Sequence, residues 1–128
     1  MLVPMWQHKE LPLVRCIVEH EGQSIELDAL VDTGSAGTML KTEIAESLGM
    51  HYMQAESVMA VYGIGGRETV YTHDLNRLII GNHAAIDFYV EVGEMNYGLQ
   101  IDAIVGVDVL SSIGAIIRMG PMVIEFEE

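Results

Sequence analysis

Short apolar runs, rich in β-branched residues and separated by glycines, are the feature that most limits what this chain can fold into. Runs of this kind, with turn residues between them, indicate many short strands. The chain has 128 residues, half of them apolar, which is enough for one core without disulfides. We therefore expect an all-β fold formed by a single domain over residues 1–128.

Two hairpins are expected where turn residues separate strand-like segments. Residues 11–19 and 24–31 flank a turn at 20–23. A second hairpin has a flexible tip of three glycines and one isoleucine at 63–66. Its strands are residues 57–62 and 67–72, and further strands are expected at 78–80, 85–92, 101–105, 115–119 and 122–126.

Two short helices are expected between the strands. Residues 42–48 have acidic side chains near their start and Gly49 just beyond their end, which predicts a helix capped by Thr42. A second helix is expected at residues 107–113, ended by Gly114, with Asp108 capping its N-terminus.

The charge of the chain excludes several classes of partner. Six Lys and Arg residues stand against nineteen Asp and Glu residues, so the net charge is −13. Such a chain is repelled by nucleic acid and by anionic membranes. The sequence starts without a signal-peptide pattern, and its most apolar region, 101–117, is interrupted by aspartates and serines. We therefore expect a cytoplasmic protein with no nucleic-acid partner and no membrane contact.

Cysteine and histidine usage argues against disulfides and metals. Cys16 is the single cysteine, which excludes an intrachain disulfide and a four-cysteine zinc site. The histidines show no pair at the spacing of metal ligands, so we expect no metal and no cofactor. They are His8, His20, His51, His73 and His83.

Asp32 is the residue best placed for chemistry. It ends an apolar run and opens the tight turn Asp-Thr-Gly-Ser, where backbone N–H groups can orient a partly desolvated carboxylate. Two carboxylates about 3 Å apart cannot both be ionised, so such a pair supplies an acid and a base together. A plain Asx turn is the alternative interpretation of the same residues.

Three segments together resemble a known family. They are ALVDTGS at 29–35, VYGIGG at 61–66 and AIVGVDVL at 103–110. In this order and spacing they resemble the active-site loop, the flap and the segment before the C-terminal helix of retropepsin-like aspartic proteases, the single-lobe relatives of pepsin. The resemblance covers residues 11–126. It implies a closed, mainly antiparallel barrel of the acid-protease type.

The resemblance also implies roles for the active-site loop. Asp32 is the catalytic residue, and it meets its own copy across the two-fold axis of a homodimer. Thr33 is expected to hydrogen-bond across the dimer, and Gly34 to permit close approach of the substrate backbone. The hydroxyl of Ser35 can donate to the carboxylate, which lowers the pKa of a carboxyl group.

The flap is expected to close over an extended polypeptide substrate that adds a strand to the sheet edge. Its residues are Tyr62, Gly63, Ile64, Gly65 and Gly66. Ile64, Ile104 and Val105 are expected to line apolar pockets. Tyr62 either donates a hydrogen bond near the catalytic loop or only packs.

The C-terminal motif supplies structural residues, Gly106 and Asp108. Viral members of the family often carry an ion pair where this chain has Ala36 and Val107. Losing both charges is physically consistent, because one buried charge without the other is costly.

The sequence therefore predicts an aspartic endopeptidase that uses a water nucleophile and a dyad formed across a homodimer. A retropepsin-fold module that dimerises or binds peptides without hydrolysing them is the alternative. An acidic β-domain with an accidental turn motif is the third interpretation.

Overall fold

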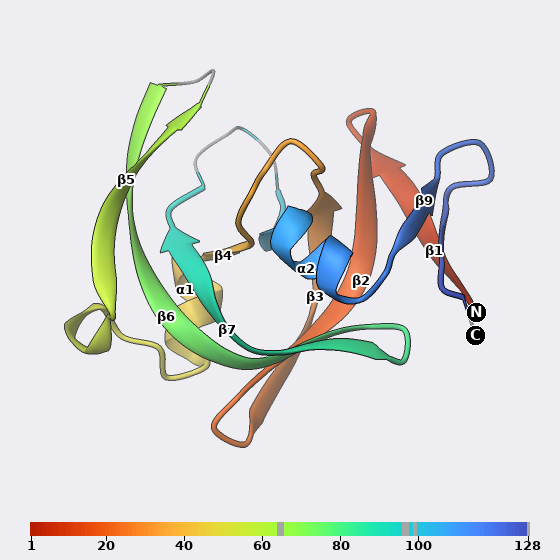
Figure 1. Cartoon of the computed structure of the whole chain (residues 1–128). Helices are drawn as coiled ribbons and strands as arrows, with labels where there is room; N and C mark the ends of the chain where they lie inside the picture. The colour runs from red at the N-terminus through yellow and green to blue at the C-terminus, as the bar shows by residue number, and fades with distance from the viewer. Residues whose placement is uncertain (64–65, 96–97, 99, 128) are drawn as a thin grey trace.

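The computed structural model of the chain describes residues 1–63, 66–95, 98 and 100–127. These residues form ten strands, two α-helices and one 3₁₀ helix (Figure 1). The strands are β1 Leu2–His8, β2 Leu11–His20, β3 Gln23–Val31, β4 Met39–Lys41, β5 Ser57–Gly63, β6 Gly66–Ile80, β7 His83–Gly93, β8 Ala103–Val105, β9 Ile116–Arg118 and β10 Val123–Glu125. The helices are α1 Thr42–Ser47, η1 Tyr52–Gln54 and α2 Val107–Ser112. The expectation of a mainly β fold with short helices is confirmed.

The strands form one sheet in the order β5-β6-β7-β4-β8-β3-β2-β1-β10-β9, and β6 also pairs with β2. The expected mainly antiparallel pairing is confirmed, but the strands are not spread evenly around one axis, so the structure does not define a closed barrel. Two pairs, β3–β8 and β4–β7, are also parallel. The long, curved β6 accounts for part of this shape, since its residues 67–72 pair with β5 while residues 77–79 pair with β2 (Figure 1).

The β2–β3 hairpin is tighter than the four-residue turn predicted from the sequence. His20 and Gln23 are already paired, which leaves two turn residues. Glu21 has φ of 47° and Gly22 has φ of 83°, the positive values that a two-residue turn between right-twisted strands requires. β1, which was not expected from the sequence, pairs with both β2 and β10.

The helices end as expected but begin differently. Gly49 and Gly114 follow α1 and α2 with φ of 80° and 67°, the conformation that favours glycine after a helix. The predicted caps are wrong: the N-cap positions belong to Lys41 and Gly106, and neither makes a side-chain cap hydrogen bond. Thr42 is the first helical residue of α1.

The core lies between the curved sheet and the helices. Its most deeply buried side chains come from β2, β4, β6, β7 and β10 and include Val14, Val18, Leu40, Leu78, Val90 and Ile124. Full burial of one such side chain contributes about 1.5–3 kcal/mol. Among the described residues, no helix has the length and apolar character needed to cross a bilayer.

Candidate active site

Asp32 lies directly after β3, where that strand leaves its parallel neighbour β8. Its N–H donates to the carbonyl of Val105 at 3.0 Å, and its carboxylate Oδ1 accepts the N–H of Gly34 at 2.9 Å. A Cβ atom at position 34 would lie 3.2 Å from that oxygen, a crowded contact. The local chain therefore orients the half-buried carboxylate, and the glycine leaves room for it.

The loop from Asp32 to Thr38 is bound to the start of α2. The carbonyl of Ser35 accepts the N–H of Val107 at 2.8 Å. A Cβ atom at Gly106 would lie 2.6 Å from the carbonyl oxygens of both Ser35 and Gly37, which is closer than real Cβ contacts come. A side chain at position 106 would therefore push the active-site loop out of place.

Thr38 is a site residue that the sequence analysis missed. Its fully buried side chain donates to Asp108 Oδ1 at 2.7 Å and accepts the N–H of Gly106 at 3.1 Å. Its own N–H donates to Asp108 Oδ2 at 3.2 Å. Asp108 thus holds the loop to α2 instead of capping the helix. The only local signal was a threonine soon after Asp-Thr-Gly.

Within the loop, the Ser35 side chain is hydrogen-bonded to the backbone, whereas Thr33 is exposed. The Ser35 hydroxyl donates to the carbonyl of Gly37 at 2.8 Å, so the expectation that it donates to the Asp32 carboxylate is wrong for this chain. Thr33 is exposed, and Val107, which follows Gly106, is 44% exposed. Val107, whose N–H donates to the Ser35 carbonyl, thus provides exposed apolar surface at the active-site loop.

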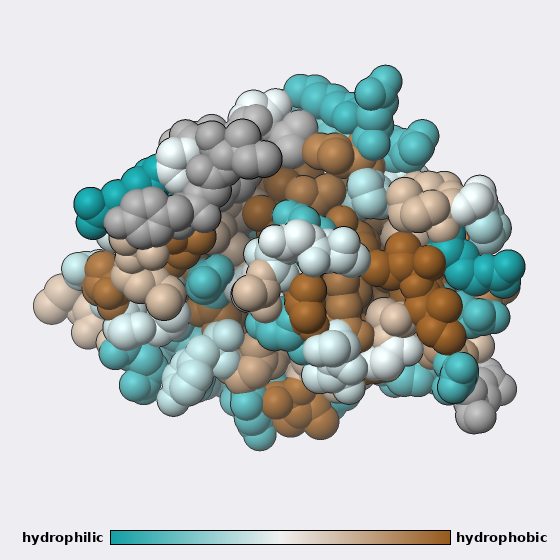
Figure 2. All heavy atoms as spheres, turned by 45° about the horizontal axis from the view of Figure 1, so that its top comes forward, coloured by the Kyte–Doolittle hydropathy of each residue, from teal (hydrophilic) through white to brown (hydrophobic). Residues whose placement is uncertain are grey.

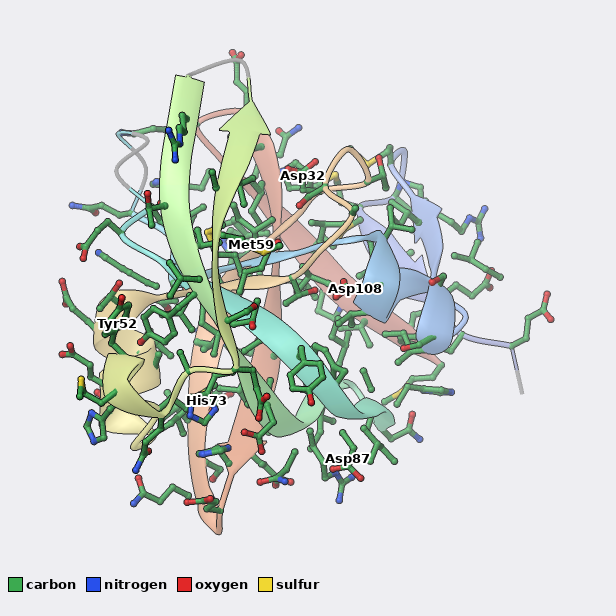
Figure 3. The ribbon with its side chains drawn as sticks, turned by 60° about the vertical axis from the view of Figure 1, so that its left-hand side comes forward. Asp32, Tyr52, Met59, His73, Asp87 and Asp108 are labelled. Carbon is green, nitrogen blue, oxygen red and sulfur yellow. The ribbon has the colours of Figure 1, made fainter. Side chains whose placement is uncertain are left out.

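The β5–β6 hairpin corresponds to the predicted flap. The two strands pair up to Tyr62 with Arg67 and Gly63 with Gly66. Ile64 and Gly65 lie outside the described residues. Figure 3 shows the described ends of β5 and β6 at the same end of the molecule as Asp32.

The side chains of Ile104 and Val105 lie on opposite faces of β8, so they do not line one pocket together. Neighbouring residues on a strand point to opposite faces, and β8 follows this alternation. Val105 is fully buried in the main core, so the expectation that it lines a substrate pocket is wrong. Ile104 is half-buried against a second, smaller apolar cluster that includes Leu13 and Met39.

Glu91 and Cys16 are two further titratable groups whose pKa values are raised. Burial, followed by the charges of Asp108 and Glu68, raises the pKa of Glu91. A Cβ at Gly37 would be 3.1 Å from a Glu91 carboxylate oxygen, so this group lies against the active-site loop. Burial also raises the pKa of Cys16 to about 12, which keeps its thiol protonated and unsuited to act as a nucleophile.

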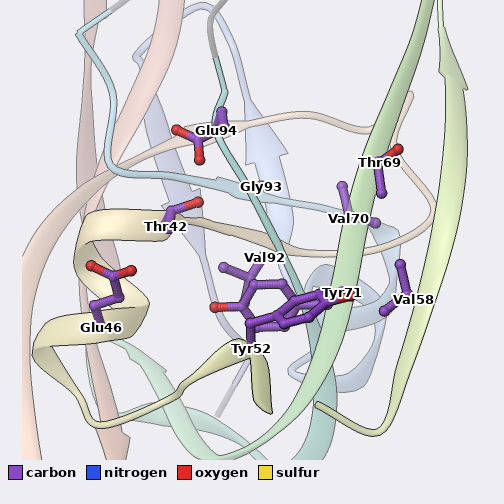
Figure 4. A pocket seen from close by; sticks show the side chains of 10 residues that line it. All are labelled: Thr42, Glu46, Tyr52, Val58, Thr69, Val70, Tyr71, Val92, Gly93 and Glu94. Atoms are coloured by element: carbon purple, nitrogen blue, oxygen red, sulfur yellow. The ribbon is translucent and has the colours of Figure 1, made fainter. Parts of the chain in front are cut away.

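Neither of the two described cavities is lined by Asp32. One, of about 270 Å³, lies between α1, η1, β5, β6 and β7 (Figure 4). Its lining residues are Thr42, Glu46, Tyr52, Val58, Thr69, Val70, Tyr71, Val92, Gly93 and Glu94. The other, of about 290 Å³, lies between β7 and α2. Figure 2 brings the Asp32 end of the molecule forward and shows apolar side chains gathered there among polar ones.

Comparison with known proteins places the chain in a family. Residues 16–109 match the aspartyl protease family, and the chain belongs to it. Its structure is similar to that of a retropepsin-like aspartic protease from Rickettsia conorii, with a TM-score of 0.71 and 17% sequence identity. The match covers 98% of this chain and 97% of that chain. No curated protein matches the sequence. The fold is therefore retropepsin-like, as the three sequence motifs implied.

Proposed function

We propose that this chain is an aspartic endopeptidase whose catalytic dyad is formed by Asp32 from each of two copies. The observation that carries the proposal is the Asp32 loop itself. Its carboxylate is oriented by the Gly34 N–H, and the loop is locked to α2 through Thr38 and Asp108. This is half of a two-carboxylate site.

A second copy of the chain is the simplest source of the other half. The sequence contains one Asp-Thr-Gly run, at residues 32–34. Asp108 is already occupied in holding Thr38 and the N–H of Val109. A two-fold axis brings the same residue of both copies to one point. Thr33, which follows Asp32, and Val107, at the start of α2, are both exposed and would then contact the partner.

The paired carboxylates would share one proton and hydrolyse a peptide bond. The ionised carboxylate takes a proton from water as the water oxygen bonds to the peptide carbonyl carbon. The protonated carboxyl gives its proton to the carbonyl oxygen. The intermediate then collapses: the carboxyl that took the water proton gives it to the leaving nitrogen, the other carboxylate takes a proton back from a hydroxyl of the intermediate, and the C–N bond breaks. No metal or cofactor takes part in these steps.

An extended polypeptide is the substrate that fits this arrangement. The β5–β6 hairpin projects at the Asp32 end, where it can cover a bound chain (Figure 3). A peptide added to a strand edge obtains main-chain hydrogen bonds there, and side-chain pockets then decide specificity. Ile104, half-buried beside the catalytic strand end, is the residue of this chain that we assign to such a pocket.

The test is cleavage of a mixed peptide library by the wild type, by Asp32→Asn and by Asp87→Asn. Asp87 is an exposed carboxylate away from Asp32 and provides a control with the same chemical change (Figure 3). We expect Asp32→Asn to lose at least about 1,000-fold in rate while remaining a dimer. Asp87→Asn should retain the rate. A wild-type dimer that binds peptides without cutting them would instead support the non-catalytic module.

Mixing the two chains tests whether the dyad spans two copies. If each active site needs Asp32 from both chains, an equal mixture of wild type and Asp32→Asn retains about one quarter of its dimers as active ones. Activity should therefore fall with the square of the wild-type fraction after subunit exchange. A linear fall would show that each chain is active by itself.

A further inference from the structure

Two buried histidines lie at some distance from the candidate active site. His20 ends β2 and is 1% exposed, and His73 lies within β6 and is 5% exposed. Their rings meet edge to face, with centroids 5.2 Å apart. Figure 3 shows His73 toward the end of the molecule opposite to Asp32. This pair therefore takes no part in the proposed proteolysis.

The pair has unused hydrogen-bonding capacity. Within the described part of the chain, His20 Nδ1 and His73 Nε2 are buried and have no hydrogen-bond partner. A buried polar group without a partner costs about 1–3 kcal/mol, so two of them in one contact require an explanation. A bound ligand that accepts electron pairs from imidazole nitrogen would provide one.

A carboxylate completes the group. Asp74 Oδ1 lies 3.0 Å from His73 Nδ1, and the Asp74 side chain is exposed at the edge of the pair. One ligand atom from each of His20, His73 and Asp74 lies within 4.8 Å of the others. Glu21, at the hairpin turn, has a carboxylate oxygen 3.9 Å from His20 Nε2.

We propose that His20, His73 and Asp74 bind a zinc ion. Two imidazoles and one carboxylate form a ligand set that suits Zn²⁺. Ligand atoms around a tetrahedral zinc lie about 3.3 Å apart, so the three atoms would approach one another by at most about 1.5 Å.

The ion would join the β2–β3 hairpin to β6. These two parts of the chain meet beyond the pairing of Ile17–Glu19 with Arg77–Ile79. Metal binding by ligands from distant segments adds its free energy to folding, because the unfolded chain does not hold the ligands together. The net charge of −13 further favours a cation. Water would fill the fourth position.

Calorimetry with zinc alone tests the site in tag-free, metal-stripped protein. We expect one ion per chain for the wild type. Asp74→Asn should bind about 10–100-fold more weakly, and since Asp74 is exposed this variant should fold. Asp87→Asn serves as the matched control and should bind as the wild type does. Absence of saturable binding, or equal binding by Asp74→Asn, would overturn the proposal.

A second measurement identifies the nitrogen ligands. Co²⁺ in place of zinc should give the visible absorption of a tetrahedral nitrogen and oxygen site. The spectrum should be lost in His73→Asn and kept in His51→Gln, whose histidine is exposed. If His73→Asn fails to fold, the Asp74→Asn spectrum decides in its place. A spectrum kept in His73→Asn and lost in His51→Gln would assign the metal to another place. Zinc binding is also measured in Asp32→Asn, which should bind as the wild type does, so that this result is separate from the test of proteolysis.

Discussion

The Asp32 loop and the His20–His73 pair both place polar groups against the core, but they satisfy those groups differently. In the loop, Ser35, Thr38 and Asp108 all direct their side chains to neighbouring protein groups at 2.7–3.2 Å. At the histidine pair, two ring nitrogens have no partner among the described residues.

This difference separates two kinds of site. A loop whose polar groups are satisfied within the chain is preorganised, so its carboxylate is held in place before any substrate arrives. A buried pair with unused nitrogens is incomplete, and a ligand can stabilise it. Substitutions that disturb the first region should therefore impair folding directly, whereas those at the second should act through metal binding.

The largest effect is expected from Gly106→Ala, which tests how tightly the loop is packed. The new methyl group would meet two backbone carbonyl oxygens at 2.6 Å, and backbone cannot yield as a flexible side chain can. We expect the free energy of unfolding to fall by about 2–4 kcal/mol in a urea titration, with loss of proteolysis.

Gly120→Ala provides the control for that result. A Cβ at Gly120 meets nothing within 4 Å, and the backbone there does not have a positive φ. Its stability should stay within about 0.5 kcal/mol of the wild type. Equal stabilities for Gly106→Ala and the wild type would mean that the loop adapts, and the contrast between the two regions would then be lost.

A smaller effect is expected from Thr38→Val. This substitution would leave polar groups of the loop without a hydrogen-bond partner, as ring nitrogens of the histidine pair are. Valine keeps the volume but leaves the Gly106 N–H and Asp108 Oδ1 without their hydroxyl partner. We expect a loss of about 1–3 kcal/mol in chemical unfolding. Thr38→Ser keeps the hydroxyl and should lose less. A Thr38→Val protein as stable as the wild type would show that the hydroxyl network does not hold the loop.

Local features of the fold could be predicted from the sequence because their causes are local. Glycines ended both helices, and the β2–β3 turn and the β5–β6 hairpin were found from their flanking strands. Residues 67–72 and 78–80 were predicted as two separate strands. They form one strand, β6, whose course depends on pairing with β5, β7 and β2.

Only the site residues that belong to contiguous sequence motifs could be predicted. Asp32 and Gly106 belong to contiguous motifs, but the bond between Thr38 and Asp108 joins residues 70 positions apart. The burial of Val105 depends on the strands on either side of β8. The histidines showed no metal-ligand spacing along the chain, and only the meeting of β2 with β6 brings His20 to His73.

The smallest effect is expected from Glu91→Gln, which tests a half-buried charge beside the loop. Glu91 donates its N–H to the Thr38 carbonyl at 2.9 Å, and its carboxylate lies beside Gly37. Burial, then Asp108 and Glu68, raises the pKa of Glu91 above its ordinary value of 4.5. The folded protein therefore holds this proton more tightly than the unfolded chain does.

That difference makes the Glu91 contribution to stability fall as the pH rises from about 4.5 through the higher pKa of the folded state. Glu91→Gln removes the charge and should flatten this fall, with a gain below about 1 kcal/mol at neutral pH because the side chain is partly exposed. Unfolding titrations across this pH range measure the effect. Glu56→Gln, at an exposed glutamate outside the loop, should leave the profile unchanged. A matching gain in Glu56→Gln would attribute the effect to net charge. The Glu91 carboxylate would then add no cost of its own beside the loop, and the loop would remain a region whose polar groups are satisfied in the folded state.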